Sequence, residues 1–310
     1  MNNSKIDALS DVLNLIRLKG CVYFSSTFSS PWGMALEQGE FAQFHIIVRG
    51  QCWLTTQNEK RLLSSGDVVL FPLGHEHCLM DELSSKTIPG KKVLEALYQN
   101  QALFCGETES VQLLCGHFEF DRTLKLPLLT ELPRLIHIKE LGRQYPGWLD
   151  IVTNVLVVET ASQAPGSGVV VDRLAEVLFV QVLRAYLSER KSLVGFLAAV
   201  KDRRINHVLK IIHTQPETNL TLETIAKTAG MSRSMLAERF KELLGTTPMS
   251  YLTCWRMLKA QNLLKTTKNS VEDIANQVGY SSEAAFSRAF RREFDLAPGS
   301  FRKSSQLEPV

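Results

Sequence analysis

A twelve-residue pattern occurs twice in the last third of this chain. Residues 221–232 are matched by residues 270–281 at one fixed offset, with Glu, Ile, Ala, Gly and Ser in the same places. After one added residue the match resumes, and Phe240 is answered by Phe290. Self-similarity at a fixed spacing indicates one supersecondary unit that is built twice.

Each copy predicts two short helices joined by a tight turn. In the first copy Thr221 fits the N-cap of a helix, and Gly230 supplies the positive φ that a sharp turn requires. Leu236 and Phe240 then recur at helical spacing and predict an inward face. A small-residue helix, a turn glycine and a second helix with a free polar face are typical of the DNA-reading helix-turn-helix.

The polar faces of the two second helices supply the candidate DNA contacts. The side chains expected to read bases are Ser234, Ala237 and Glu238 in the first copy and Glu283, Ala284, Ser287 and Arg288 in the second. The side chains better placed for phosphates, which position a protein without specifying sequence, are Arg233, Lys241, Arg291 and Arg292. A structural helical hairpin is the alternative for a single copy, and the presence of two copies favours DNA binding.

The doubled segment resembles the DNA-binding domain of AraC/XylS-family transcription regulators. Residues 279–290 (GYSSEAAFSRAF) and 298–302 (PGSFR) carry the resemblance. Two positions depart from the family pattern: Asp295 stands where a glycine usually ends the second reading helix, and Glu238 stands where a basic residue is common. A carboxylate facing a groove does not favour phosphate, although it accepts a hydrogen bond from cytosine N4.

The charge distribution agrees with this interpretation. Residues 201–310 hold 17 Lys and Arg against 11 Asp and Glu, whereas residues 1–200 hold 18 against 21. The basic excess therefore lies in the segment assigned to DNA, as neutralisation of phosphates requires.

The beginning of the chain predicts a cytoplasmic protein. Residues 1–20 show apolar side chains at helical spacing among charges, which indicates an amphipathic docking helix rather than a secretory signal. No apolar run approaches the roughly 20 residues that a membrane span needs. The six cysteines are expected to be reduced thiols.

Residues 21–120 change to short β-branched and aromatic runs that predict strands. The segment 66–77 (GDVVLFPLGHEH) resembles the second signature of cupin barrels, and many AraC/XylS regulators carry a cupin-like sensor domain. Residues 115–121 (CGHFEFD) also resemble one such cupin-headed branch. The resemblance therefore implies a cupin-like sensor domain ahead of the DNA-binding domain.

Three histidines are candidate ligand-binding residues of this barrel: His45, His75 and His77. Metal-dependent cupins usually place a second histidine where Ile47 stands, and no carboxylate partner is evident, so we expect no metal, no cofactor and no catalysis. A cupin metalloenzyme fused to a DNA-binding domain remains the alternative, with His45 and His77 as ligands.

Two cysteines are candidate redox residues. Cys21 lies before the first strand and Cys115 ends the last one, so that an oxidised pair would change the packing of the barrel. A reactive thiol needs a pKa lowered by nearby cations, and in sequence only Lys19 and His117 are close. Buried cysteines are also ordinary core residues.

Residues 125–188 predict helices. The segment 169–187 is apolar on most sides, so more than one neighbour should cover it. We expect either an internal hairpin or a dimer interface, with the interface formed by Leu174, Leu178, Val182 and Leu183.

The sequence thus predicts an α+β chain: an N-terminal cupin-like β-barrel with flanking helices and a C-terminal all-α double helix-turn-helix domain. The expected boundaries are a sensor and dimerisation domain over 1–190 (barrel about 21–120, helical hairpin about 125–188), a linker over 191–200 and a DNA-binding domain over 201–310. The expected function is that of a transcription activator that is not an enzyme. Its expected partners are double-stranded operator DNA, RNA polymerase, a small-molecule or redox effector and a second copy of the chain.

Overall fold

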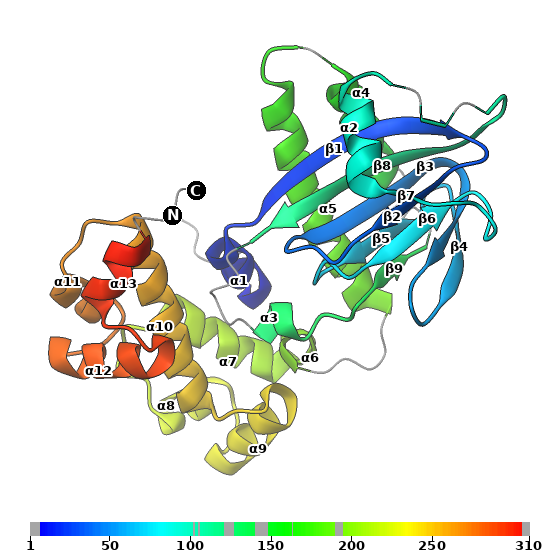
Figure 1. Ribbon diagram of the computed structural model, residues 1–310. Helices are drawn as coiled ribbons and strands as arrows, with labels where there is room; N and C mark the ends of the chain where they lie inside the picture. The colour runs from blue at the N-terminus through cyan, green and yellow to red at the C-terminus, as the bar shows by residue number, and fades with distance from the viewer. Residues whose placement is uncertain are drawn as a thin grey trace. The chain divides into compact units, whose positions relative to one another are not determined.

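The computed structural model describes residues 7–101, 103–104, 106–120, 127–139, 148–162, 164–189 and 195–305. The chain forms two compact units (Figure 1). The sheet unit comprises Arg17–Arg122 and Leu132–Lys191, and the helical unit comprises Met1–Ile16, Thr123–Glu131 and Ser192–Val310. Two segments that we expected in the sensor domain, at residues 1–16 and 123–131, therefore group with the DNA-binding helices.

Two sheets that share one long strand form the sheet unit. The strands are β1 (Lys19–Ser29), β2 (Gly33–Leu36), β3 (Ala42–Thr55), β4 (Lys60–Ser64), β5 (Val68–Phe71), β6 (His77–Met80), β7 (Ile88–Pro89), β8 (Glu109–Glu119) and β9 (Ile136–Ile138). One sheet has the order β1-β8-β3-β5-β9, and the other has the order β4-β3-β6-β2-β7. All pairings are antiparallel except the one between β2 and β7. The cupin-like β-barrel that we expected is thus present as two sheets joined through β3.

Gly50 lets β3 pass from the first sheet to the second. The register against β8 shifts between Ile47 and Arg49, and Gly50 has φ of 83°. A Cβ atom at this position would lie 2.1 Å from the carbonyl oxygen of Ser110, so only glycine fits. Apolar side chains from both halves of β3, including Ile47 and Leu54, then meet in one core between the sheets.

Three helices belong to the sheet unit: α2 (Gly90–Tyr98), α4 (Trp148–Ala161) and α5 (Ser167–Glu189). The α5 helix lies along β1 (Figure 1), and Phe179 contacts Phe118 of β8 at a ring distance of 4.9 Å. Leu178, Val182 and Leu183 are buried on this face. The fold of this chain already buries these three residues, so they are not available for the expected subunit interface, whereas Leu174 is half-buried.

The helical unit contains α1 (Ala8–Ile16), α3 (Pro127–Thr130), α6 (Gly195–Lys201), α7 (Arg203–Thr214), α8 (Leu222–Thr228), α9 (Arg233–Leu244), α10 (Pro248–Thr266), α11 (Val271–Gln277), α12 (Glu283–Phe294) and α13 (Pro298–Ser305). Residues 195–200, which we expected in a linker over 191–200, form most of α6. Phe196 and Leu197 are buried there, where α6 packs on α7 and α9. Residues 191–194 lie outside the described residues.

The two copies of the repeat form matching helix pairs, α8 with α9 and α11 with α12. Thr221 and Ser270 each close a capping box at the start of the first helix, which satisfies backbone N–H groups that the helix leaves unpaired. Gly230 and Gly279 adopt φ of 64° and 84° at the two turns. The predicted doubled helix-turn-helix is therefore present. Among the described residues, no helix is long and apolar enough to cross a membrane.

The N-terminal helix α1 packs on α7 of the helical unit. Its apolar face, with Leu9 and Val12, is buried. Asp11 Oδ2 lies 3.4 Å from Nδ1 of His213. The His213 ring stacks on Trp255 of α10 at 3.6 Å. The amphipathic docking helix is thus found, and within its unit it docks on α7, the helix that precedes the first copy of the repeat.

The ends of the two reading helices provide a stability prediction. Gly245 and Asp295 both follow the last turn in the left-handed region, with φ of 69° and 59°. A side chain in this conformation costs roughly 1–2 kcal/mol, somewhat less for Asp and Asn. We expect Asp295→Gly to raise the free energy of unfolding of the helical unit by about 1 kcal/mol, as measured by urea unfolding.

Gly245→Asp is the matched control for this prediction. A Cβ atom at Gly245 meets nothing within 4 Å, so that this substitution changes the backbone preference without a steric clash. It should lower the free energy of unfolding by a similar amount. Equal stability of all three proteins would contradict the backbone argument.

Candidate nucleic-acid interface and barrel cavity

The second helix of each copy presents a polar face to solvent. Inward-facing Leu236 and Phe240 of α9 and Phe286 and Phe290 of α12 are fully buried, which fixes the rotation of each helix. The eleven predicted DNA contacts are all exposed or half-buried: Arg233, Ser234, Ala237, Glu238, Lys241, Glu283, Ala284, Ser287, Arg288, Arg291 and Arg292. Their contact with DNA remains a prediction, and their accessibility fits it.

Three other arginines of the helical unit hold its own structure. Arg239 pairs with Asp202 at 3.0 Å and with Glu242 at 2.7 Å. Arg256 Nε donates to the carbonyl oxygen of Pro216 at 2.7 Å, and Arg302 Nη2 donates to that of Asn269 at 2.6 Å. Their bonds to protein groups explain why a count of basic residues overstates the cations available to phosphate.

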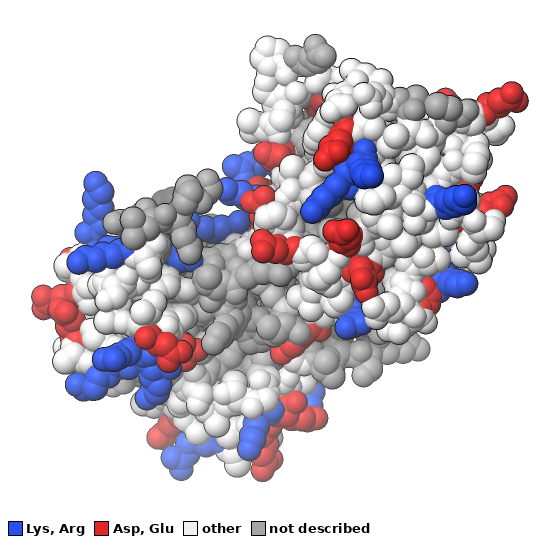
Figure 2. Space-filling model, in the orientation of Figure 1, with Lys and Arg blue, Asp and Glu red and all other residues white. Residues whose placement is uncertain are grey.

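The charge of the helical unit is mixed rather than of one sign. Figure 2 shows blue Lys and Arg side chains over these helices, with red Asp and Glu side chains between them. Exposed Glu238 on α9 belongs to this mixture. The α12 helix, with Arg288, Arg291 and Arg292 exposed, therefore offers more positive charge to DNA than α9 does.

The sheet unit contains a line of buried hydrogen-bonding groups. His45 of β3 lies with Nδ1 3.0 Å from Sγ of Cys115 and with Nε2 2.8 Å from Nε2 of His77. His77 Nδ1 lies 2.7 Å from the carbonyl oxygen of His75. One assignment of hydrogens satisfies all three contacts: the Cys115 thiol donates to His45, His45 donates to His77, and His77 donates to the carbonyl.

Burial keeps this line of groups uncharged. It lowers the pKa of His45, helped by the neighbouring His77, well below the usual value. It also lowers the pKa of His77 to about 4. Burial raises the pKa of the Cys115 thiol well above its usual value. Both imidazoles are therefore neutral and the thiol is protonated at neutral pH.

Within the described part of the chain, no three His, Cys, Asp or Glu side chains are grouped to hold a metal ion. His45 instead bonds to His77 and to Cys115.

A cavity of about 390 Å³ lies beside this line of groups. His45 and Cys115 line it, together with residues that sequence reasoning missed, among them Tyr23, Phe41 and Gln43. His77 stacks on Phe71 at 3.7 Å outside the cavity wall. His75 lines a separate cavity of about 120 Å³. Of the three predicted ligand-binding histidines, the structure thus brings His45 alone to the larger cavity.

The two candidate redox cysteines lie on neighbouring strands. The register pairs Cys21 with His117 and pairs Cys115 with Phe24, with a bulge at Tyr23. Both thiols are free. Burial, with Asp172 and Glu119 nearby, raises the pKa of Cys21, which is opposite to the shift that a reactive thiol needs.

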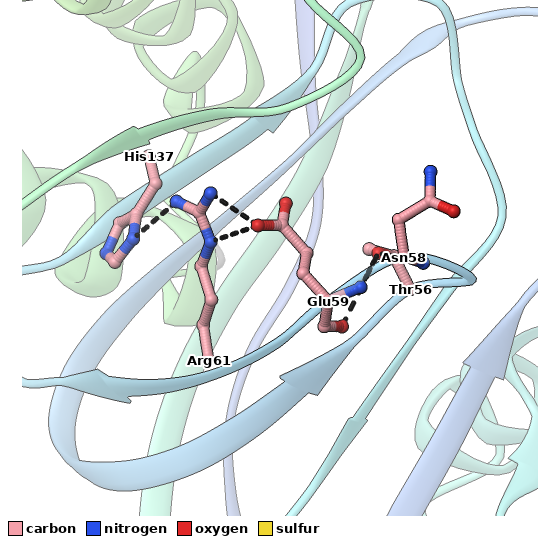
Figure 3. A network of polar contacts seen from close by, with 5 residues as sticks. All are labelled: Thr56, Asn58, Glu59, Arg61 and His137. Atoms are coloured by element: carbon pink, nitrogen blue, oxygen red, sulfur yellow. Dashed lines mark hydrogen bonds and ion pairs between the residues drawn. The ribbon is translucent and has the colours of Figure 1, made fainter.

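A second polar network ties the β4 hairpin to β9 (Figure 3). Arg61 Nε donates to Glu59 at 2.8 Å, and its Nη1 lies 3.4 Å from Nδ1 of His137. His137 Nε2 lies 3.1 Å from Oδ2 of buried Asp67. Asp67 also accepts from the backbone N–H of Ser64 at 3.1 Å. The Gly66-Asp67 pair of the cupin signature therefore forms a turn, and the carboxylate of Asp67 bonds to His137 on β9, the strand that pairs with β5.

The neutral His45 and His77 predict acid sensitivity of the sheet unit. Below pH 6.5 the unfolded chain takes up protons at both residues. In the folded chain the pKa of His77 is lowered to about 4, and burial lowers that of His45 well below its usual value. The contribution of the two neutral histidines to the free energy of unfolding is therefore fully present above pH 6.5 and is lost as the pH falls. Between pH 7 and 5 the wild type should lose about 2–4 kcal/mol more than His45→Phe/His77→Phe. Parallel pH profiles in urea unfolding would contradict this.

Comparisons with known proteins agree with the geometry of both units. A family model described as Cupin matches residues 7–188. A model described as Helix-turn-helix domain matches residues 225–304. These ranges cover the sheet unit and the two reading helices.

Three full-length relatives are transcription regulators by name. The chain is 31% identical over 306 residues, 97% of this chain and 100% of the relative, to the HTH-type transcriptional regulator AlkR of Acinetobacter baylyi. It is 29% identical to a putative AraC-like transcription regulator of Streptomyces antibioticus, over 96% and 99% of the two chains. It is 26% identical to the RCS-specific HTH-type transcriptional activator RclR of Escherichia coli, over 98% and 100%. The chain therefore belongs to the AraC/XylS family of transcription regulators and carries an N-terminal cupin domain.

Proposed function

We propose that this protein is a transcription activator that binds operator DNA in the cytoplasm through two reading helices and responds to an effector bound in its cupin domain. The observation that carries the proposal is the pair of exposed polar faces on α9 and α12. The helix between the two copies, α10, has 19 residues and is about 28 Å long. This is close to the roughly 34 Å between major grooves on one side of a duplex.

A small molecule is the effector that the geometry favours over an oxidant. The cavity beside His45 has the size of a small-molecule site. The raised pKa values of Cys21 and Cys115 do not favour rapid oxidation of either thiol. The activating role is supported by the name of the E. coli relative. The proposed route of activation is contact with RNA polymerase.

A second copy of the chain is the partner proposed for the α4–α5 hairpin. Its outward face exposes apolar side chains, among them Ile151, Val158 and Val169, each more than 60% exposed. The inward face of α5 is covered by β1, so the outward face needs a separate partner to be removed from water. In the dimer, the effector would change the spacing of the two DNA-binding domains.

Selection from random duplexes tests DNA recognition. Full-length protein should enrich a site with two blocks about one helical turn apart. Arg288→Ala should weaken binding to that site by about 1–3 kcal/mol and relax the preference in one block, because Arg288 is expected to pair with guanine. Equal weakening on every sequence would identify a phosphate contact instead.

Lys303→Ala is the control for Arg288→Ala. It removes the same charge from an exposed position on α13, outside both reading helices. Lys303→Ala should leave the sequence preference of the protein unchanged. Enrichment of no sequence by the full-length protein would contradict the proposed function.

Sedimentation velocity tests the dimer. Ile151→Glu/Val158→Glu places two carboxylates in the proposed interface and should shift the protein to monomers at micromolar concentration. Leu62→Glu/Leu83→Glu makes the same chemical change at positions that are each 45% exposed elsewhere on the sheet unit, and should leave the dimer intact. A wild-type monomer, or equal behaviour of the two variants, would contradict this interface.

A further inference from the structure

The walls of the larger cavity are mainly apolar. Tyr23, Phe24, Met34, Leu36 and Leu94 contribute to them, and α2 covers part of the opening through Lys91 and Leu94. Its volume is about 390 Å³. One water takes about 30 Å³ in the liquid, so the cavity holds roughly a dozen groups of the size of a water or a methylene. The occupant is therefore a small, largely apolar molecule.

The described residues that line the interior of the cavity include no charged side chain without a partner. The polar groups of His45 and Cys115 bond to each other, and the second nitrogen of His45 bonds to His77. Their hydrogens are used within this line of contacts, and all three side chains are neutral. The interior thus offers no cation to a carboxylate and no carboxylate to an ammonium group.

The charges around the opening do not change this conclusion. Glu37, Glu40 and Lys91 line it, and all three are exposed. Exposed charges are screened by water and salt and contribute little. Two carboxylates against one ammonium group also give no positive field that would attract an anion.

Gln43 is the polar group that the protein leaves unsatisfied here. Its side chain lines the cavity, and its Oε1 is buried and bonds to no other group of the described chain. Burial of an amide oxygen without a hydrogen bond is unfavourable, so a hydrogen-bond donor in the cavity would be stabilising. A hydroxyl group donates and accepts, and therefore fits either orientation of the amide.

We propose that the cavity binds an uncharged, mainly apolar molecule with one hydroxyl group, and that this hydroxyl bonds to the Gln43 side chain. The inference rests on the proposed sensing role of the cavity and names the chemical class of its ligand. Burial of an ion without a partner is far less favourable than burial of a hydroxyl that gains one. The cavity consequently selects an alcohol over an acid or an amine of the same length.

Calorimetry on the full-length protein with octanol, octanoate and octylammonium tests this selection. The three probes share one chain and differ in the end group. Octanol should bind at least about tenfold tighter than either ion. Tighter binding of either ion, equal binding of all three, or no binding of octanol would overturn the proposal.

The contribution of Gln43 is tested by substitution. Gln43→Leu should weaken octanol binding by a factor of roughly 3 to 10, the value of one neutral hydrogen bond. Gln51→Leu is the matched control, because Gln51 lies on the same strand, exposed, with its amide on Ser64. It should leave octanol binding unchanged. Equal effects of the two variants would overturn the role of Gln43.

DNA binding is measured separately on the same proteins. Retained binding of the selected duplex with failed octanol selectivity would overturn the ligand class alone. Failure of duplex binding with intact octanol selectivity would instead contradict the proposed function. Thermal unfolding of each variant shows whether it is folded, and the selectivity of the wild type tests the ligand class in any case.

Discussion

The passage of β3 between the two sheets is the constraint on which the cupin domain depends. Gly50 makes it possible, because the carbonyl oxygen of Ser110 occupies the place of a side chain. Before Gly50 the strand supplies Gln43 and His45 to the cavity wall, and after it the strand supplies Cys52 and Leu54 to the core. The cavity wall and the core therefore both depend on the course of β3 through the junction of the two sheets.

Local signals made the DNA-binding helices predictable from sequence. Caps such as Thr221 and turn glycines such as Gly230 act within a few residues, and the structure confirms both. The cupin signature was similarly readable, since Gly66 and Asp67 form a turn whose function is local. Each of these features depends on residues that lie close together along the chain, so a short segment of sequence is enough to predict it.

The cavity was not predictable because distant residues form it. Tyr23, Gln43 and Leu94 come from β1, β3 and α2, and strand pairing together with the packing of α2 on the strands brings them together. The face of α5 that packs on the sheet was likewise not predictable from the sequence. The pattern of a helix that is apolar on most sides does not tell which face is covered: Leu178 is buried and Val177 is exposed, and packing of α5 on β1 and α4 decides this.

The membership of α1 in the helical unit bears on how a signal leaves the cupin domain. The chain passes from α1, which ends at Ile16, to β1, which begins at Lys19. Lys19 is paired with Glu119 at the end of β8, beyond which the chain leads to α3. Strands β1 and β8 also carry Tyr23 and Cys115 of the cavity wall.

In the proposed sensing role, a change at the cavity wall would reach α1 through β1, because only Arg17 and Leu18 separate Ile16 at the end of α1 from Lys19 at the start of β1. The α1 helix packs on α7 through buried apolar side chains, with Asp11 beside His213. A movement of β1 that displaced α1 would therefore act on α7, the helix that precedes the first copy of the repeat.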